Sequence, residues 1–384
     1  MGCDSCNKRI AVVQRVIFHY RVGLFQEMSQ KWEVKVFYGD SVTGTKVINA
    51  KPPYPFQTQK LFTIHKKSRK NPQQILFFNP GLVLRLLRWR PDIILLEGSN
   101  NMLNNIVIYL FCKLFRKKYI WWGIGRVPGR KDSLYRKTLT PFRKLLIRQA
   151  LAVLAYCNLS AEYFSEITDS NKIWVFPNSL NNKAIEKEII QVTDEDKDAL
   201  RKKVGLPPNC VTLLYVGAME YNKRLEILLD AFKILEDTGY NVKLLLIGSG
   251  CAEQSFRSYA EKINVRNCVF LGKIITGINM YFQIADIFVL PGRGGLAVNQ
   301  ALINGLPVVC NTPADGTELD MIVNGYNGFL LEKMTAKQLV DCLVEMIEDN
   351  KYSDMGKNSR NIVEEQYNID AMLKVLGDVV TGCA

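Results

Sequence analysis

Two glycines open a short helix in the second half of the chain, in the segment VLPGRGGLAVNQALINGLPVVC from Val289 to Cys310. Gly294 and Gly295 precede this predicted helix, Gly305 ends it, and a buried strand follows. The first turn of a helix exposes backbone N–H groups and the positive end of the helix dipole, which favours a bound phosphate. The segment therefore predicts an anion site, with a turn that serves packing alone as the alternative.

The anion site is predicted to lie at one edge of a parallel sheet. Apolar runs that end in glycine recur along the second half, and such strands, alternating with helices, are typical of a parallel sheet covered on both faces. Lys223 follows the first of these strands and is the cation that we expect to contact the phosphate. Ligands of such sheets bind at the carboxyl ends of the strands. Those ends hold Gly217, Gly248, Gly250, Gly272 and Gly294.

The order of these motifs resembles the donor domain of the retaining glycosyltransferases of family 4, which have the GT-B fold. In the second half, the resemblance rests on residues 217–223, 248–250, 285–291 and 294–309, and on the segments DGTE (315–318) and NGFL (327–330). In the first half, it rests on YRVGLF (20–25), RPDII (90–94) and IWVFPNSL (173–180). It spans nearly the whole chain, and its specificity comes from the order and spacing of the motifs.

The resemblance implies an α/β protein of the GT-B class, with two Rossmann-like domains facing across a cleft. It also implies an enzyme that moves a sugar from a UDP- or GDP-sugar to a lipid-linked saccharide in polysaccharide or glycoconjugate synthesis. Retention of configuration and independence of metal cofactors belong to the same implication. Two other classes stay open: a non-catalytic partner that keeps the fold, and a sugar-nucleotide 2-epimerase, against which the basic first half counts.

Sugar transfer needs cations for the leaving diphosphate and contacts for the nucleoside, the sugar and the acceptor. For the diphosphate we expect Lys223, Arg293 and the turn and helix start at Gly294, Gly295, Leu296 and Ala297. For the nucleoside we expect close approach at Gly217, Gly248 and Gly250, a border at Lys273, and ribose contacts from Asn299 and Gln300. For the sugar and the acceptor we expect Glu318, which could instead cap a helix, Arg21 and His19.

Four positions depart from the family pattern. The family commonly carries two glutamates eight positions apart, where this chain has Gly292 and Gln300. It also carries an arginine where this chain has Ala218, and a histidine where it has Ile124. Gln300 can accept a hydrogen bond from a ribose hydroxyl, but without charge. These departures are the reason for keeping the non-catalytic alternative open.

Positive charge is concentrated in the first half of the chain. Residues 1–190 hold 31 Lys and Arg against 12 Asp and Glu, whereas residues 191–384 hold 19 against 25, within a net charge of +13. The basic clusters are interleaved with aromatic and aliphatic residues, a mixture that favours an anionic membrane surface as partner. A solvated basic surface is the alternative. No nucleic-acid recognition motif accompanies the charge, so we expect no nucleic-acid partner.

The cysteines and the apolar runs indicate the cellular compartment in which we expect the protein. Ten cysteines are scattered without a disulfide framework, so we expect reduced thiols. Cys3 and Cys6 have the spacing of a zinc-binding pair, but a structural zinc ion needs two more ligands and no second pair or nearby His is present, so we expect no metal. No apolar run is long enough to span a membrane, and no signal peptide is evident. We therefore expect a cytoplasmic protein, bound peripherally to the inner face of the membrane.

The elements that must hold these residues divide the chain into four parts. Residues 1–180 are expected to form the acceptor-side Rossmann-like domain, 181–193 a linker, and 194–350 the nucleotide-sugar-binding domain. Residues 351–384 are expected to be a helical segment that crosses back to the first domain, as in related folds. The stretch from Ser41 to Pro72, rich in Lys, Pro and Thr, is expected to be an irregular, mobile loop.

Overall fold

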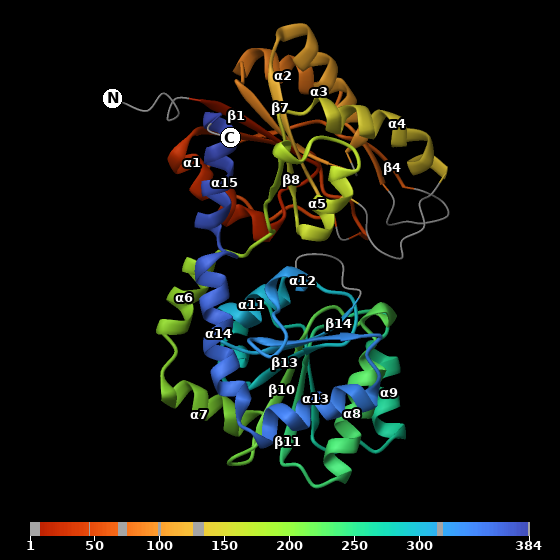
Figure 1. Ribbon diagram of the computed structural model, residues 1–384, viewed down its shortest axis with the longest axis vertical. Coiled ribbons are helices and arrows are strands. Elements are labelled where there is room, and N and C mark those ends of the chain that lie inside the picture. Colours follow the sequence, from red (N-terminus) through yellow and green to blue (C-terminus); the bar gives the residue numbers. More distant parts are fainter. Residues whose placement is uncertain are drawn as a thin grey trace. The chain divides into compact units, whose positions relative to one another are not determined.

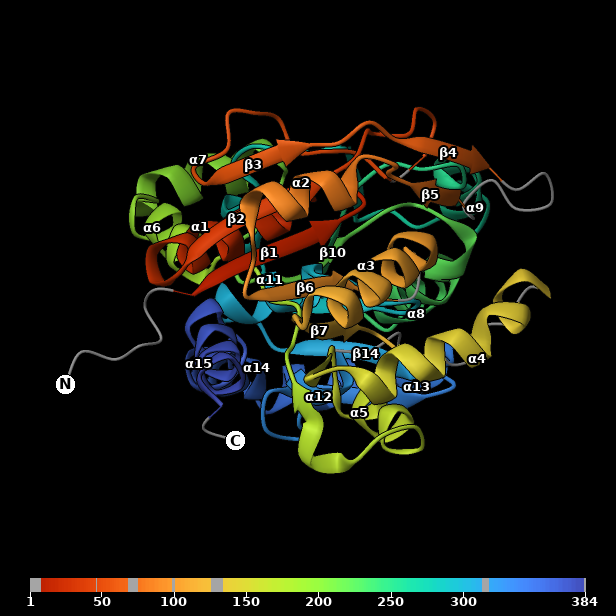
Figure 2. The ribbon, with the colours of Figure 1, turned by 90° about the horizontal axis from the view of Figure 1, so that it is seen from above.

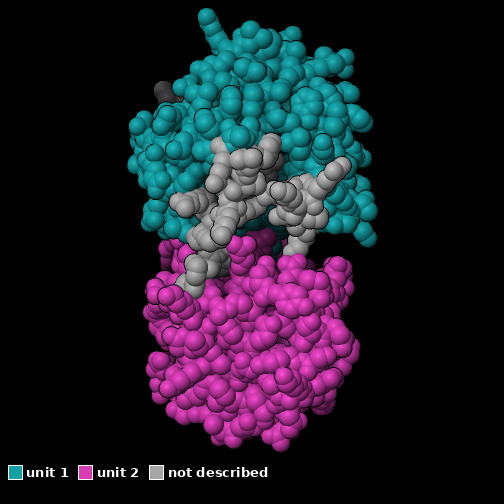
Figure 3. Space-filling model, turned by 90° about the vertical axis from the view of Figure 1, so that its right-hand side faces the viewer, with its two compact units in different colours: residues 1–180, 369–384 teal, residues 181–368 magenta. Residues whose placement is uncertain are grey.

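The computed structural model of the chain describes residues 8–45, 47–67, 75–98, 101–125, 134–312 and 318–382. The chain forms two compact units, one built from Met1–Leu180 with Ile369–Ala384 and the other from Asn181–Asn368 (Figures 1 and 3). Each unit has helices packed around a parallel sheet, as the alternation of apolar strands and helices predicts. The prediction of two Rossmann-like units is therefore confirmed.

Seven parallel strands form the sheet of the first unit, in the order β3-β2-β1-β6-β7-β8-β9. In β1, Ile10 and Val12 face one core cluster while Ala11 and Val13 face the other, which explains why the strand is apolar along its length. The strand order reverses between β1 and β6, the position at which sheets of this type bind ligands. The strands are β1 (Arg9–Gln14), β2 (Glu33–Tyr38), β3 (Gln57–Lys60), β6 (Ile93–Glu97), β7 (Lys118–Gly123), β8 (Ala152–Ala155) and β9 (Ile173–Val175).

The stretch from Ser41 to Pro72 is more regular than the sequence predicts. It contains β3, which extends the main sheet by pairing with β2. It also contains β4 (Ile64–Lys67), which pairs antiparallel with β5 (Ile75–Phe78). The sequence does not predict β3, because the segment QTQK lies at the edge of the sheet and lacks the apolar pattern of a buried strand.

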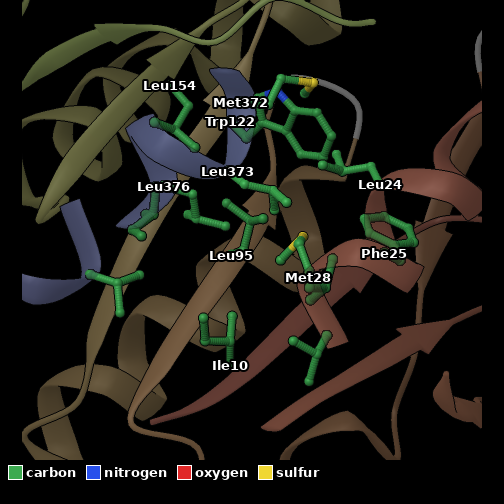
Figure 4. Close-up of a cluster of buried hydrophobic side chains, with 14 of the residues drawn as sticks. Ile10, Leu24, Phe25, Met28, Leu95, Trp122, Leu154, Met372, Leu373 and Leu376 are labelled. Atoms are coloured by element: carbon green, nitrogen blue, oxygen red, sulfur yellow. The ribbon is translucent and has the colours of Figure 1, made fainter. Parts of the chain in front are cut away.

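Helices cover both faces of this sheet. On one face, Leu24, Phe25 and Met28 of α1 share a core with Met372 and Leu373 of α15 (Figure 4). Because α15 follows the second unit in the sequence, the last helix crosses back to the first unit, as predicted. The opposite core receives α2, α3, α4 and α5. The helices are η2 (His19–Arg21), α1 (Val22–Lys31), α2 (Leu82–Trp89), α3 (Met102–Phe115), α4 (Leu134–Gln149), α5 (Asn158–Ser165), η3 (Ser170–Lys172) and α15 (Ile369–Thr381).

Six parallel strands form the sheet of the second unit, in the order β12-β11-β10-β13-β14-β15. Here the strand order reverses between β10 and β13, so the loops that follow these two strands diverge from a common edge. The strands are β10 (Val211–Val216), β11 (Val242–Ile247), β12 (Cys268–Gly272), β13 (Ile287–Leu290), β14 (Val308–Thr312) and β15 (Gly328–Glu332).

The second unit begins earlier and ends later in the sequence than the predicted domain of residues 194–350. Residues 181–193, for which the sequence predicts a linker, contain α6, whose N-cap Asn181 accepts a hydrogen bond from the amide of Ala184. The terminal helical segment is divided, because α14 belongs to the second unit and α15 to the first. The helices are α6 (Asn182–Ile190), α7 (Asp194–Lys203), η4 (Tyr221–Lys223), α8 (Leu225–Asp237), α9 (Glu253–Lys262), α10 (Ile278–Gln283), α11 (Ala297–Ile303), α12 (Glu318–Met321), α13 (Ala336–Glu348) and α14 (Lys351–Glu365).

Candidate functional site

Lys223 lies where the strand order of the second sheet reverses, between the loops that follow β10 and β13. It ends η4, and its ammonium nitrogen donates hydrogen bonds to the carbonyl oxygens of Arg293 and Gly294, the second over 3.0 Å. The backbone amide of Arg293 in turn donates to the carbonyl oxygen of Asn222 over 3.2 Å. The structure thus joins the two segments that carry the cations predicted for a phosphate.

Gly292, one of the departures from the family pattern, is required by the packing of these two loops. An ideal Cβ atom at this position would lie 2.4 Å from the carbonyl oxygen of Asn222 and 2.5 Å from the Cα atom of Lys223. Such contacts are far below the van der Waals separation, so any side chain would push the loops apart. The backbone of Lys223 therefore fills the space in which the side chain of a glutamate would begin.

The glycines at the ends of β10 and β11 pack against the chain itself. A Cβ atom on Gly248 would lie 1.8 Å from the carbonyl oxygen of Gly217, and one on Gly250 would lie 2.2 Å from that of Met219. The loops after these two strands therefore approach each other closely because both are rich in glycine. The sequence predicts that a nucleoside approaches Gly217, Gly248 and Gly250, and this stays a prediction beside the packing role that the structure shows.

The start of α11 presents backbone amides at the same edge. Val298 and Gln300 donate to the carbonyls of Gly295 and Leu296, which closes the first turn. Among the described residues, the amides of Gly295, Leu296 and Ala297 have no backbone acceptor, as expected for a helix start. Gly294, which accepts from Lys223, comes immediately before them. The turn therefore places backbone donors next in sequence to the segment held by the lysine.

The two predicted ribose contacts have different surroundings. Asn299 is fully buried, and its amide donates to the carbonyl oxygen of Tyr367 over 3.2 Å and contacts the sulfur of Met321. It therefore holds the second unit together, and this placement does not fit a ligand contact. Gln300 is only half-buried, and its amide nitrogen donates to the side-chain oxygen of Asn279 over 2.9 Å.

A partly buried hydrogen-bond network explains why residue 300 is glutamine. The carboxylate of Glu188 on α6 accepts a hydrogen bond from the Asn279 amide nitrogen over 2.6 Å, which turns the Asn279 oxygen toward α11. That oxygen accepts from both Gln300 and Asn304. A glutamate at position 300 would place a second acceptor against it, so the network favours a side chain that donates. The oxygen of the Gln300 amide is the atom that this arrangement leaves for a ribose hydroxyl.

Two further predicted residues lie at the ends of strands or helices. Lys273 is exposed and comes directly after β12, at the same edge of the sheet as Gly217 and Gly248. Glu318 is the first residue of α12, but its side chain, like residues 315–317 of the DGTE motif, lies outside the described part of the structure. Contacts of Lys273 and Glu318 with a donor stay predictions.

Arg21 lies in the first unit, where the strand order reverses between β1 and β6. Its side chain is 3% exposed and donates to the side chains of Gln14 and Tyr156. Its guanidinium lies 4.1 Å from the ring centre of Trp122, a cation–π contact. Burial raises the pKa of Tyr156 to about 12, so its hydroxyl stays protonated. The sequence predicts a phosphate contact for Arg21, whereas the structure gives it a packing role among its own unit's side chains.

A buried ion pair stands beside Arg21. Glu97, at the end of β6, accepts hydrogen bonds from the Arg15 guanidinium over 2.6 and 2.9 Å and from the Arg15 backbone amide over 2.8 Å. Burial by itself would raise the pKa of Glu97, but the charge and hydrogen bonds of Arg15, with the charge of Arg21, hold it below its ordinary value of 4.5. Glu97 is therefore an anion that fixes the loop after β1.

Replacing Glu97 by glutamine is expected to destabilise the first unit by about 2 kcal/mol at neutral pH, because hydrogen bonds to a charged partner are lost. A carboxylate whose pKa falls on folding adds stability above its unfolded pKa of about 4.5 and loses it as the pH falls through the folded value. The difference between the wild type and Glu97→Gln should therefore shrink below about pH 4.5.

The measurement is urea unfolding followed by tryptophan fluorescence at several pH values. All five tryptophans lie in the first unit, so this signal reports that unit alone. Glu33→Gln is the matched control, because the Glu33–Arg9 ion pair is exposed and should contribute at most about 1 kcal/mol. A difference that is the same at all pH values would contradict the assignment of a charged Glu97.

His19 is placed in η2, two residues before Arg21. It is exposed, and its ring meets that of Tyr20 edge to face, with 5.5 Å between the ring centres. Partial burial lowers the pKa of His19 from its ordinary value of 6.5, so the imidazole is neutral at neutral pH. A neutral, accessible imidazole is compatible with the predicted role of His19 beside a substrate, which stays a prediction.

Sequence reasoning missed the residues that organise both regions: Gln14, Glu97 and Tyr156 in the first unit, and Glu188 and Asn279 in the second. Only Glu97 carried a local signal, because an acidic residue ends an otherwise apolar strand.

In the part of the chain that the structure describes, no three His, Cys, Asp or Glu side chains gather as a metal site would require. Among the described helices, none combines the length and apolar character of a membrane span.

Comparison with known proteins relates the second unit to glycosyltransferases, as the resemblance in the sequence predicts. Residues 196–362 match the family of glycosyl transferases group 1. The capsular polysaccharide biosynthesis glycosyltransferase CapM of Staphylococcus aureus is 30% identical over 210 residues, 53% of this chain and 53% of CapM. The GDP-mannose-dependent monoacylated alpha-(1-6)-phosphatidylinositol monomannoside mannosyltransferase of Corynebacterium glutamicum is 27% identical over 206 residues, 50% of this chain and 53% of that protein. The chain thus spans about half the length of these two relatives.

A solved structure shows the fold over the whole chain. HepE of Anabaena, crystallised with UDP, superimposes with a TM-score of 0.76 and 16% identity, covering 98% of this chain and 100% of HepE. The same protein has been crystallised with UDP-glucose. Likeness at this level of identity establishes the fold alone. The family match covers residues 196–362, which lie in the unit that holds Lys223. Residues 196–362 therefore match the glycosyl transferases group 1 family, within a chain that has the GT-B fold.

Proposed function

We propose that this protein is a glycosyltransferase that moves a sugar from a nucleotide-sugar to a saccharide acceptor in polysaccharide or glycoconjugate synthesis. The observation that carries the proposal is the position of Lys223 within residues 196–362, which match the glycosyl transferases group 1 family. The lysine holds the turn before α11 at the point where the strand order reverses. A cation and a helix start at such an edge are the groups that a diphosphate requires.

The chemistry of the leaving group follows from this geometry. As the bond to the sugar breaks, negative charge grows on the diphosphate, and donors fixed in advance stabilise it. Lys223 and Arg293 would supply charge, and the amides of Gly295, Leu296 and Ala297 would supply backbone donors. The Gln300 oxygen would accept a hydrogen bond from a ribose hydroxyl. We expect these groups to neutralise the diphosphate without a metal cofactor.

The proposed donor, acceptor, stereochemistry and place of action rest on the family resemblance and on the names of the relatives. HepE binds UDP and UDP-glucose in its crystals, and the corynebacterial relative is named for GDP-mannose, so we propose a UDP- or GDP-sugar as donor. That relative is named for a phosphatidylinositol mannoside, and CapM for capsular polysaccharide. We therefore propose a lipid-linked saccharide as acceptor, transfer with retention of configuration, and action at the cytoplasmic face of a membrane.

The donor class can be tested by thermal unfolding of the purified protein with UDP, GDP, ADP and their common sugar conjugates. A ligand at about 100 times its Kd adds about 2.7 kcal/mol to the stability of the folded state, so one nucleotide class should raise the unfolding temperature. The rise should shrink in Gln300→Ala and stay unchanged in a control, Gln366→Ala, whose residue follows α14.

Each alternative has its own signature in this experiment. No rise with any nucleotide at millimolar concentration would overturn the proposed donor site. A rise without transfer to any lipid-linked acceptor would instead indicate a non-catalytic partner. Conversion of the donor sugar in the absence of an acceptor would indicate an epimerase.

A further inference from the structure

Three helices of the first unit form one outer layer. The helices α2, α3 and α4 bury one side each in the same core cluster, through residues such as Leu86, Ile108 and Leu146. α3 packs between α2 and α4, and Figure 2 shows the three helices side by side. Their opposite sides consequently form a continuous part of the molecular surface, which we call the α2–α4 surface.

Large apolar side chains are exposed on the α2–α4 surface. Leu114 is 75% exposed and Leu110 59%, although both belong to a helix whose other side is fully buried. Single exposed leucines are common on proteins, but a group of them over adjacent helices indicates a contact surface. The exposed apolar residues are Leu84, Leu87, Leu110, Leu114, Phe115, Phe142 and Leu145.

The same helices carry charge of one sign only. α2 holds two arginines, α3 one lysine and α4 five lysine or arginine residues, and none of the three helices contains Asp or Glu. Arg85, Arg88 and Lys144 are exposed, and within the described residues none of them has a carboxylate partner. The exposed leucines therefore share these helices with exposed cations for which the described residues provide no ion pair.

We propose that the α2–α4 surface docks on the anionic headgroups of a membrane, with its leucine and phenylalanine side chains entering the interface. Lipid headgroups supply phosphate for the cations, and the acyl boundary beneath them supplies an apolar phase for the leucines. A nucleic acid would match the charge but leave the apolar side chains in water. A second copy of the chain would match the apolar residues but bring like charges together. The inference does not depend on the proposed transfer reaction, because it concerns a surface with its own ligand.

The apolar half of the proposal is tested with vesicles of phosphatidylglycerol and phosphatidylcholine, compared with vesicles of phosphatidylcholine alone. The wild type should co-sediment with the anionic vesicles. The double variant Leu110→Gln/Leu114→Gln should lower the partition coefficient about tenfold or more, since two interfacial side chains are lost. The matched control is Ile190→Gln/Ile234→Gln, which removes two exposed isoleucines from helices of the second unit and should leave partition unchanged.

The electrostatic half is tested with Arg85→Gln/Arg88→Gln/Lys144→Gln. Each basic residue near an anionic surface contributes roughly a factor of five to binding, so this variant should lose about a hundredfold. Lys202→Gln/Lys262→Gln/Lys337→Gln, with three exposed lysines of the second unit, should lose little. Unchanged circular dichroism and an unchanged nucleotide-induced rise in unfolding temperature would show that the variants are folded.

Three results would overturn the proposal: no binding of the wild type to anionic vesicles, equal losses in test and control variants, or binding to neutral vesicles alone. Concentration-dependent dimers that Leu110→Gln/Leu114→Gln abolishes, without vesicle binding, would assign the surface to a second copy of the chain. A failure to bind nucleotides would not affect these results, so the two proposals fail separately.

Discussion

Lys223→Ala is expected to lower the rate of sugar transfer by about 10²- to 10³-fold and to abolish the nucleotide-induced rise in unfolding temperature. Loss of one fixed donor to a developing negative charge costs an enzyme about this much, because no water molecule replaces it in a preorganised site. Lys223 also donates to the carbonyls of Arg293 and Gly294, so its removal loosens the turn before α11 as well. Transfer of a radiolabelled sugar from the donor identified by thermal unfolding measures the effect.

Two variants separate the charge of Lys223 from its role in the turn. Lys223→Arg keeps the charge and should retain part of the activity, whereas Lys223→Met keeps only the aliphatic stem and should resemble Lys223→Ala. Lys262→Ala, on the exposed face of α9, is the control and should behave as the wild type. Activity within about threefold of the wild type in Lys223→Met would contradict the proposed site, since that corresponds to less than 1 kcal/mol of transition-state stabilisation.

Gly248→Ala is expected to destabilise the second unit by about 3 to 5 kcal/mol, the largest change in stability that we predict. Two costs add at this position. The φ angle of +146° belongs to a region that residues with a side chain rarely adopt, and the new methyl group would lie 1.8 Å from the carbonyl oxygen of Gly217. Because Gly217 is backbone, the neighbour cannot relieve the contact by changing a rotamer, and β10 and β11 must move apart.

Urea unfolding followed by two signals tests this prediction. Tryptophan fluorescence reports the first unit alone, whereas far-ultraviolet circular dichroism reports both units. Gly248→Ala should therefore lower the midpoint of the circular dichroism transition more than that of the fluorescence transition. Gly295→Ala is the control, because its Cβ atom would meet nothing within 4 Å and its φ angle is not in the left-handed region. Equal stability of the two variants would refute the packing role of Gly248.

The departures from the family pattern have physical causes in the structure. At Gly292 the backbone of Lys223 leaves no room for a side chain, and at Gln300 the Asn279 oxygen selects a donor. Packing at Gly292 and hydrogen bonding at Gln300 therefore explain these two residues without a loss of function. This removes two of the reasons for preferring a non-catalytic partner, while transfer activity itself is decided by the experiments above.

The sequence by itself determined the two Rossmann-like units, because buried parallel strands are apolar along their length and end in glycine at the edge where loops cross. It also located Lys223 and the start of α11, since a cation and a helix start are local features. It did not locate β3, whose polar residues pair at an edge. Nor did it separate Asn299, which is buried, from its neighbour Gln300, which is not.

Only the tertiary structure decided how the remaining side chains are used. The burial of Arg21 depends on Gln14, Trp122 and Tyr156, which come from three different strands or their ends. The α2–α4 surface exists because three successive helices bury their opposite sides in one core, so that their exposed leucines and the cations that lack an ion pair among the described residues lie on one surface. Such contacts join residues separated by tens of positions, and no local pattern records which side of a helix the fold will cover.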